Sequence, residues 1–373
     1  MKVFLHRGSM LIFLLVTVAL VLLNSAKQKR IFILHSYNTD YAWTRGLNLG
    51  LEKGMRELSH GRVNYDVRYY YMNAKNIPFE TDADARGPVK QALQAIEMYQ
   101  PDVIIAFDDI AQKFVVAPNY INRSGVNIVF SGVNGDETRY CKLTQDGEKV
   151  CYNTAINVVG TLERIPVASV IDIIHFLQLE NPQALASTKH VHFLLDESIT
   201  AMQDALYLER QDWQDMEFSV SPPIDTYEDW QNYILGINQE SVDFLLVDGY
   251  RKLRIGEGVS TNNSAEPRIY ADPILVARWT EASSNIPVIG LNAFSSEDGF
   301  MLSVGVSASA LGYKAFAKAS HLITDDPPVN SLVRVDISDQ YVVAINQPAM
   351  KQRGLKIPNM LQVFARATEH FYE

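Results

Sequence analysis

Short apolar runs alternate with segments of helical spacing along almost the whole chain. Residues 103–107 form one such run, and residues 127–130 form the next. Strands that are buried on both faces read as continuous apolar runs, whereas half-exposed strands alternate apolar and polar residues. The pattern therefore predicts an α/β fold, in which parallel sheets are covered by helices on both faces.

The same pattern begins again after Asn157, and a chain of 373 residues is long enough for two domains. We therefore expect two doubly wound, Rossmann-like lobes. The segments after residue 300 must join sheets that are already formed, so the chain should cross between the lobes repeatedly and make a multi-strand hinge. The predicted N-terminal lobe comprises residues 31–157 and 297–326. The predicted C-terminal lobe comprises residues 158–296 and 327–373.

The N-terminus has the order of a secretory signal, which we place at residues 1–26. Lys2 and Arg7 precede an uncharged run from Met10 to Leu23, and small or polar residues lead to Ala26. The run is shorter than the roughly 20 residues that span a bilayer, which favours a cleaved signal peptide. An uncleaved signal anchor is the alternative. Both predict a periplasmic chain, either released or anchored by its N-terminal segment.

The two cysteines, Cys141 and Cys151, lie ten positions apart in a polar stretch. In an oxidising compartment such a pair closes a surface loop as a disulfide. No His or further Cys is near them in the sequence, so a metal site is not expected there. Two free thiols are the alternative if the chain is not exported.

Charge and motifs exclude several classes of function. The chain has 33 Lys and Arg against 43 Asp and Glu residues, a formal charge of −10 that repels nucleic-acid phosphates. The sequence contains no H-E-x-x-H, no G-x-S-x-G and no phosphate-binding loop, and its His residues show no metal spacing. We therefore expect no nucleic-acid partner, no cofactor, no metal and no enzymatic activity.

Ligands of open parallel sheets bind at the carboxyl ends of the strands. In the first lobe this rule selects polar, aromatic and glycine residues that follow the predicted strands: Ser36, Tyr37, Trp43, Asp108, Asp109, Ser131, Gly132 and Asn134. In the second lobe it selects Asp248, Tyr250 and Asn292. Gly160 is added because it follows the expected crossing between the lobes.

The chemistry of these residues suits a small polar ligand. Ser36 and the helix N-terminus beside it can hold a carboxylate or another acceptor. One of Asp108 and Asp109 is expected to cap the following helix, and the other to face the cleft and take a ligand ammonium. Gly132 allows close backbone approach, and Asn134 can both donate and accept.

Three further residues have open alternatives. Trp43 either covers the ligand or packs against the following helix. Asp196 occupies a strand end, where a capping role is expected. Glu163 follows the predicted crossing and either faces the cleft or makes a solvated contact.

Four segments carry a resemblance to a known family. They are residues 31–37 with Trp43 and Gly46, residues 128–134, residues 298–305 with Gly312 and Ala315, and residues 344–358. Their order and spacing resemble the ABC-transporter substrate-binding proteins whose familiar members bind tryptophan and tyrosine. The resemblance implies a type I periplasmic binding protein fold with a ligand between the lobes, such as an aromatic amino acid or a related compound. The segments 141–151 and 253–271 look like insertions relative to that family.

The expected function is extracytoplasmic solute binding, in which the lobes close on a small molecule. The family uses such proteins in two ways, so the expected partner is an ABC permease or a membrane sensor. A third hypothesis is a hydrolase on the same frame, with Asp108, Asp109 and Asp248 as acid and base groups. The sequence offers no nucleophile motif to support it.

Overall fold

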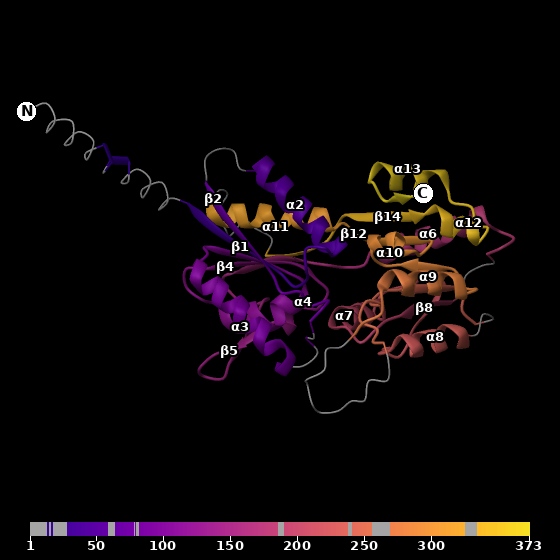
Figure 1. Ribbon diagram of the computed structural model, residues 1–373, viewed down its shortest axis with the longest axis horizontal. Coiled ribbons are helices and arrows are strands. Elements are labelled where there is room, and N and C mark those ends of the chain that lie inside the picture. Colours follow the sequence, from indigo (N-terminus) through magenta and orange to yellow (C-terminus); the bar gives the residue numbers. More distant parts are fainter. Residues whose placement is uncertain are drawn as a thin grey trace, which may run out of the picture.

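The computed structural model describes residues 13–14, 16–17, 28–58, 64–77, 79, 82–185, 190–237, 241–255, 269–324 and 334–373, with residues 82–84 described as backbone only. Most of the predicted signal and most of the predicted insertion at 253–271 lie outside these residues. Among the residues described, no helix has the length and apolar character to cross a bilayer. The chain folds into two α/β lobes side by side (Figure 1), which confirms the predicted fold class.

The N-terminal lobe is built on a six-stranded sheet in which every neighbouring pair is parallel. Its order is β13 (Val335–Ile337), β7 (Val158–Leu162), β4 (Asn127–Val133), β3 (Val103–Phe107), β1 (Lys29–His35) and β2 (Tyr65–Tyr71). The central strand β3 is buried throughout. This burial explains why its sequence is a continuous apolar run.

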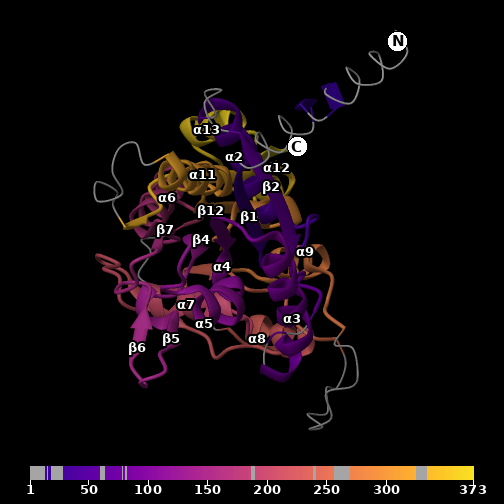
Figure 2. The ribbon, with the colours of Figure 1, turned by 90° about the vertical axis from the view of Figure 1, so that its left-hand side faces the viewer.

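Helices cover both faces of this sheet. Figure 2 shows α2 (Ala42–Leu58) and α11 (Ala308–Thr324) on one side, with α3 (Asp82–Tyr99), α4 (Asp108–Ala111) and α5 (Ala117–Tyr120) on the other. A π-helical turn, Gln112–Val116, joins α4 to α5. Helices α2 and α11 pack backbone to backbone, because a Cβ at Gly50 would overlap Ser309 and one at Gly312 would overlap Leu47.

The C-terminal lobe is built on a seven-stranded sheet. Its order is β15 (Phe371–Tyr372), β14 (Tyr341–Asn346), β12 (Leu302–Val306), β11 (Val288–Gly290), β10 (Phe244–Val247), β8 (His190–Leu194) and β9 (Glu217–Val220). The pairs are parallel except β12 with β14. The helices are α6 (Val167–Glu180), α7 (Ile199–Leu208), α8 (Tyr227–Gly236), α9 (Pro273–Ser283), α10 (Ala293–Asp298), α12 (Gln347–Gln352) and α13 (Asn359–Ala367).

The chain crosses between the lobes after β7, after β12 and after β13. The crossing segments are hydrogen-bonded to one another. Ser338 N donates to Leu162 O over 2.9 Å, and Ser307 N donates to Gln340 O over 3.0 Å. These contacts make the three connections one hinge.

The crossings differ from the boundaries expected from the sequence. Strands β7 and β13 fell within the predicted C-terminal lobe but belong to the first sheet, whereas β12 fell within the predicted N-terminal lobe but belongs to the second. The reason is that the chain leaves the first lobe only after β7, and that α11 and β13 return to that lobe from the C-terminal part of the chain. A restart in the strand–helix pattern marks where a new lobe begins along the sequence, and it does not reveal such a return.

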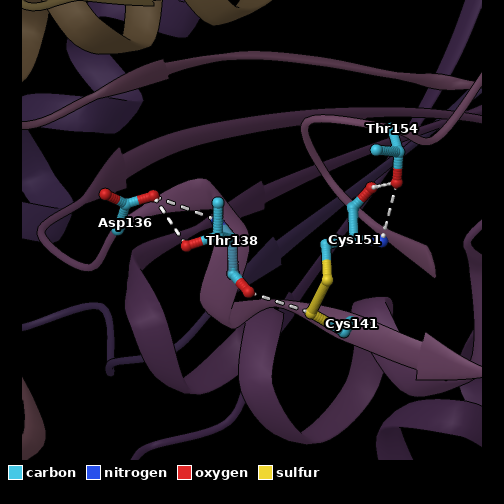
Figure 3. Close-up of a disulfide and its surroundings, with 5 residues drawn as sticks. All are labelled: Asp136, Thr138, Cys141, Cys151 and Thr154. Carbon is cyan, nitrogen blue, oxygen red and sulfur yellow. Dashed lines mark hydrogen bonds between the residues drawn. A yellow bond between two sulfur atoms is a disulfide. The ribbon is translucent and has the colours of Figure 1, made fainter. Parts of the chain in front are cut away.

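The predicted disulfide between Cys141 and Cys151 is confirmed (Figure 3). It joins directly opposed residues of a two-stranded hairpin, β5 (Cys141–Leu143) and β6 (Lys149–Cys151). A short 3₁₀ turn, Glu137–Arg139, leads into the hairpin, and Asp136 caps it by accepting a hydrogen bond from Thr138 N over 3.1 Å. The disulfide and the cap therefore hold this hairpin in a fixed position after β4, beside the carboxyl end of the first sheet.

Candidate ligand-binding site

A small cavity lies between the two lobes, at the carboxyl ends of their strands. Its volume is about 30 Å³, close to that of a single water molecule. The lobes therefore stand closed, and a larger ligand requires them to separate. The lining residues are Tyr37, Tyr41, Trp43, Lys75, Asp108, Asn134, Glu163, Ser198, Thr200, Ala201, Asp248, Gly249 and Asn292.

The N-terminal lobe contributes side chains that follow its strands. Trp43, in the first turn of α2, donates from Nε1 to Asp108 Oδ1 over 2.8 Å. Asp108 has a φ of +66°, a left-handed conformation that residues other than glycine rarely adopt. Gly132 lies alongside with a φ of +64°, and a Cβ there would be 3.3 Å from Asp108 Oδ1. The strained backbone at Asp108 thus sets a carboxylate at the cavity wall.

The C-terminal lobe contributes the ends of β10 and β11 and the start of α7. Asn292 Nδ2 donates to Asp248 Oδ1 over 2.9 Å, which orients this carboxylate. Gly249 has a φ of +67°, and a Cβ there would be 2.3 Å from that of Ala201. The glycine therefore lets the turn after β10 lie directly against α7.

Two hydrogen bonds join the lobes across the cavity. Asn134 Nδ2 donates to Asp204 Oδ1 over 2.8 Å, and the Tyr37 and Thr200 hydroxyls lie 3.0 Å apart. Tyr37 and Asn134 follow strands of the first sheet, whereas Thr200 and Asp204 lie on α7. The closed arrangement thus depends on polar contacts that involve residues of the cavity wall itself.

Carboxyl groups crowd this region. Burial raises the pKa of Asp108 well above its usual range, and the Asp109 charge adds to the shift. Burial also raises the pKa of Glu163, with further contributions from Asp108 and Asp248. The pKa of Asp204 is raised by burial and by Asp248, with which it is hydrogen-bonded. Closing the lobes therefore disfavours the ionised forms of these groups.

Lys75 is the positively charged member of the cavity lining, among the residues the structure describes. Its Nζ lies 4.6 Å from the ring centre of Tyr37 and 5.3 Å from that of Tyr41. Burial lowers the pKa of Lys75, and the charges of Asp196 and Asp248 oppose that shift. The aromatic side of the cavity is thus occupied by a tethered ammonium group.

Two acceptor atoms at the cavity have no hydrogen-bond partner in the described part of the chain. They are Asp108 Oδ2 and Asn134 Oδ1, on residues whose exposed fractions are 3% and 5%. Buried polar atoms are normally paired, because leaving one unpaired costs roughly 1–3 kcal/mol. Within the same part of the chain, no group of three or more His, Cys, Asp or Glu side chains is arranged to hold a metal ion.

The structure brings six of the predicted residues into the cavity lining: Tyr37, Trp43, Asp108, Asn134, Asp248 and Asn292. Gly132 borders it through its contacts with Asp108 and Trp43. Of the alternatives for Trp43, the lining position and the bond to Asp108 favour a place in the site. Glu163 faces the cavity, whereas Asp196 holds the backbone by accepting from Ser198 N and Lys252 N.

Five predicted residues lie outside the lining, and each has another role. Ser36 Oγ donates to Phe107 O over 2.7 Å and accepts from Ala111 N, which ties β1 to β3 and α4. Ser131 Oγ donates to Leu311 O over 3.4 Å, against α11. The Tyr250 hydroxyl donates to Asp298. Gly160 lies in β7, where a Cβ would overlap the Phe130 ring.

Asp109 is the fifth residue outside the lining, and it supports the site from behind. Its carboxylate accepts from Asn134 N over 3.2 Å, from Gly135 N over 2.8 Å and from the Tyr140 hydroxyl. It therefore fixes the turn that carries Asn134. One of the two aspartates does face the cleft as expected, but the other anchors the end of β4 instead of capping α4, whose N-cap is Phe107.

Sequence reasoning missed several residues of the site. Lys75 follows β2, so the strand-end rule reaches it if the edge strand is included. Tyr41 lies in the turn before α2, and Thr200 in the first turn of α7. Asp204 is farther along α7, and no strand-end signal marks it.

No protein-family model matches this sequence, and no curated protein matches it. Solved structures do match across most of the chain. A conserved domain protein from Vibrio cholerae has a TM-score of 0.59 and 17% identity, covering 90% of this chain and 98% of its own. These similarities show the type I periplasmic binding protein fold.

Two further solved structures of binding proteins match this chain with similar coverage. An ABC domain from Streptococcus pneumoniae, solved in complex with L-Trp, has a TM-score of 0.56 and 13% identity and covers 90% of this chain and 98% of its own. A substrate-binding protein with adhesive properties from Clostridium difficile, solved ligand-free and open, has a TM-score of 0.55 and 16% identity. The match covers 88% of this chain and 96% of that protein.

Proposed function

We propose that this chain is an exported solute-binding protein whose lobes close on a small molecule. The observation that carries the proposal is the interlobe cavity, where both lobes contribute buried polar side chains at the carboxyl ends of their strands. Open α/β sheets bind ligands at this edge, and a hinge lets two such edges close on one molecule. The closed form is then read by an ABC permease at the periplasmic face of the membrane.

The lining supports a ligand with both a polar group and a flat or apolar body. Tyr37, Tyr41 and Trp43 offer ring surfaces, while Asp108, Asn134 and Asp248 offer hydrogen-bonding atoms. An aromatic amino acid or a related compound has this combination. A neighbour of the same fold was solved with L-Trp, so the fold accommodates a ligand of this size.

The test combines ligand-induced stabilisation with closure. Amino acids, amines and sugars are added to the purified full-length chain, and the melting temperature and radius of gyration are recorded. A ligand at 100 times its Kd should stabilise the folded state by about 2.7 kcal/mol. It should also hold the lobes closed around itself, at a larger separation than in this structure, whose cavity has room for little more than water. A compound that is consumed, or a bound ligand that leaves the lobes free to separate, contradicts the proposal.

A further inference from the structure

We propose that the cleft selects an organic cation: an amine without a free carboxylate, whose ammonium group bonds to Asp108 and Asn134. The apolar or aromatic body of the ligand then packs against Tyr37 and Trp43. This inference rests on the solute-binding function proposed above and narrows its ligand to one chemical class. Tryptamine, which is tryptophan without its carboxylate, illustrates that class.

The balance of charge in the closed cleft is the first argument. Asp108, Glu163 and Asp248 line the cavity, and Asp204 is hydrogen-bonded to Asn134 in its wall. Lys75 is the only cationic side chain among the described lining residues; behind the lining, Arg164 neighbours Glu163, and Arg251 is paired with Asp298. Closing the lobes without a further positive charge brings these carboxyl groups together in a medium of low dielectric constant. A ligand cation would supply the missing charge and allow the carboxylates to stay ionised.

The unpartnered acceptors are the second argument, and they are independent of the charge count. Asp108 Oδ2 and Asn134 Oδ1 lack a hydrogen-bond donor in the described structure, although both residues are more than nine-tenths buried. Their neighbouring atoms are satisfied, since Asp108 Oδ1 accepts from Trp43 and Asn134 Nδ2 donates to Asp204. These two acceptors therefore lack a donor, and an alkylammonium group brings three.

The position of Lys75 is the third argument. Its ammonium group lies over the rings of Tyr37 and Tyr41, which shows that the aromatic wall of the cavity accepts a cation. A protonated amine placed in the same cavity would share this electrostatic environment. Lys75 would then oppose the ligand amine instead of pairing with it.

A free amino acid fits this arrangement less well than the matching amine. Its carboxylate would add negative charge to a cavity that already contains an excess of carboxyl groups, and among the described lining residues Lys75 is the only one able to form an ion pair with it. Like charges brought together in a desolvated site cost several kcal/mol. The carboxylate is therefore the group by which the site should discriminate.

The experiment is isothermal titration calorimetry on the purified full-length chain at pH 7.5. Tryptamine and tyramine are compared with tryptophan and tyrosine, each pair differing by one carboxylate. We expect each amine to bind at least ~10-fold more tightly than its amino acid, a conservative value for one ionic mismatch.

Two variants separate the roles of the charged residues. Asp108→Asn should weaken amine binding by about 10-fold or more, because the charge-assisted bond is lost. Lys75→Met should leave amine binding unchanged or make it tighter, because a competing cation is removed. The matched controls are Asp146→Asn and Lys149→Met, which change exposed residues of the disulfide hairpin and should leave binding as in the wild type.

The possible contrary results differ for the two proposals. Equal binding of amine and amino acid, or weaker amine binding in Lys75→Met, overturns the cation assignment and leaves solute binding intact. Selective binding of an amino acid, a neutral sugar or a divalent metal ion in place of amines has the same meaning. If no compound of any class binds, both the assignment and the proposed function fail.

Discussion

Asn134 and Asp204 join the two lobes directly, with the Asn134 amide donating to Asp204 Oδ1 over 2.8 Å in a site buried from solvent. Asp204 is also hydrogen-bonded to Asp248, at the end of a strand in its own lobe. The contact between the lobes is therefore part of the carboxyl cluster. Because of this link, the position of the lobes and the protonation of the cleft are coupled.

Removing the Asn134 side chain should open the lobes. A typical hydrogen bond contributes roughly 0.5–1.5 kcal/mol, and Asn134→Ala also leaves the buried Asp204 Oδ1 without this donor. We expect a larger radius of gyration in small-angle X-ray scattering without added ligand. Asn153→Ala, at an exposed turn, is the matched control and should scatter like the wild type. An unchanged radius in Asn134→Ala would show that this contact does not hold the lobes closed.

The closed form should lose stability as the pH rises. Burial and the charges of neighbouring carboxyl groups raise the pKa of Glu163 and of Asp204 in the closed form. A carboxyl with a raised pKa binds its proton more tightly in that form, so the stabilisation is complete below the ordinary carboxyl pKa of about 4. It is lost as the pH rises through the raised values. The charged groups that face these two side chains are Asp108, Asp109, Arg164 and Asp248.

The measurement is the radius of gyration between pH 4 and pH 8 without ligand. We expect it to increase with pH in the wild type. Asp204→Asn cannot ionise, so its increase should be smaller. A radius of gyration that decreases as the pH rises would contradict the coupling between carboxyl protonation and closure of the lobes.

Reducing the disulfide should lower stability without changing the fold class. The bond between Cys141 and Cys151 closes a loop of about ten residues, for which the chain-entropy relation gives about 3 kcal/mol. We expect a reductant to lower the melting temperature by several degrees. The double variant Cys141→Ser, Cys151→Ser should melt at the lower temperature with or without reductant. If reductant lowers the melting temperature of both proteins equally, the effect does not come from this bond.

The sequence predicts the positions of the site better than the directions of its side chains. The strand-end rule locates Asp108, Asn134 and Asp248, because the carboxyl ends of parallel strands meet at one edge of the sheet. Neighbours at a strand end face opposite sides, however. Ser36 therefore ties strands together while Tyr37 lines the cavity, although the two are adjacent.

Other parts of the site depend on tertiary structure that no local pattern encodes. Asp204 reaches the cleft from the middle of α7 only because the lobes close on one another. The placement of β7 and β13 in the first sheet and of β12 in the second likewise follows from sheet completion, and the spacing of apolar runs does not specify it. The fold class follows from periodicity, whereas the composition of each sheet requires the structure.

The adjacent residues Asp108 and Asp109 should respond oppositely to the same substitution. Asp109 accepts hydrogen bonds from Asn134 N, Gly135 N and the Tyr140 hydroxyl. In Asp109→Asn, the side-chain NH₂ group would face these donors in place of a carboxylate oxygen. Because unsatisfied buried donors cost roughly 1–3 kcal/mol each, we expect a clear drop in the melting temperature.

Asp108 has one partner, Trp43, which Asn can retain through its carbonyl oxygen. Burial raises the pKa of Asp108, so its charge opposes folding near neutral pH, and Asp108→Asn removes that charge. We therefore expect a melting temperature equal to or above that of the wild type, together with weaker amine binding. A residue that is retained for ligand binding can be replaced without loss of stability. Equal destabilisation by the two substitutions would therefore show that Asp108 is a structural residue.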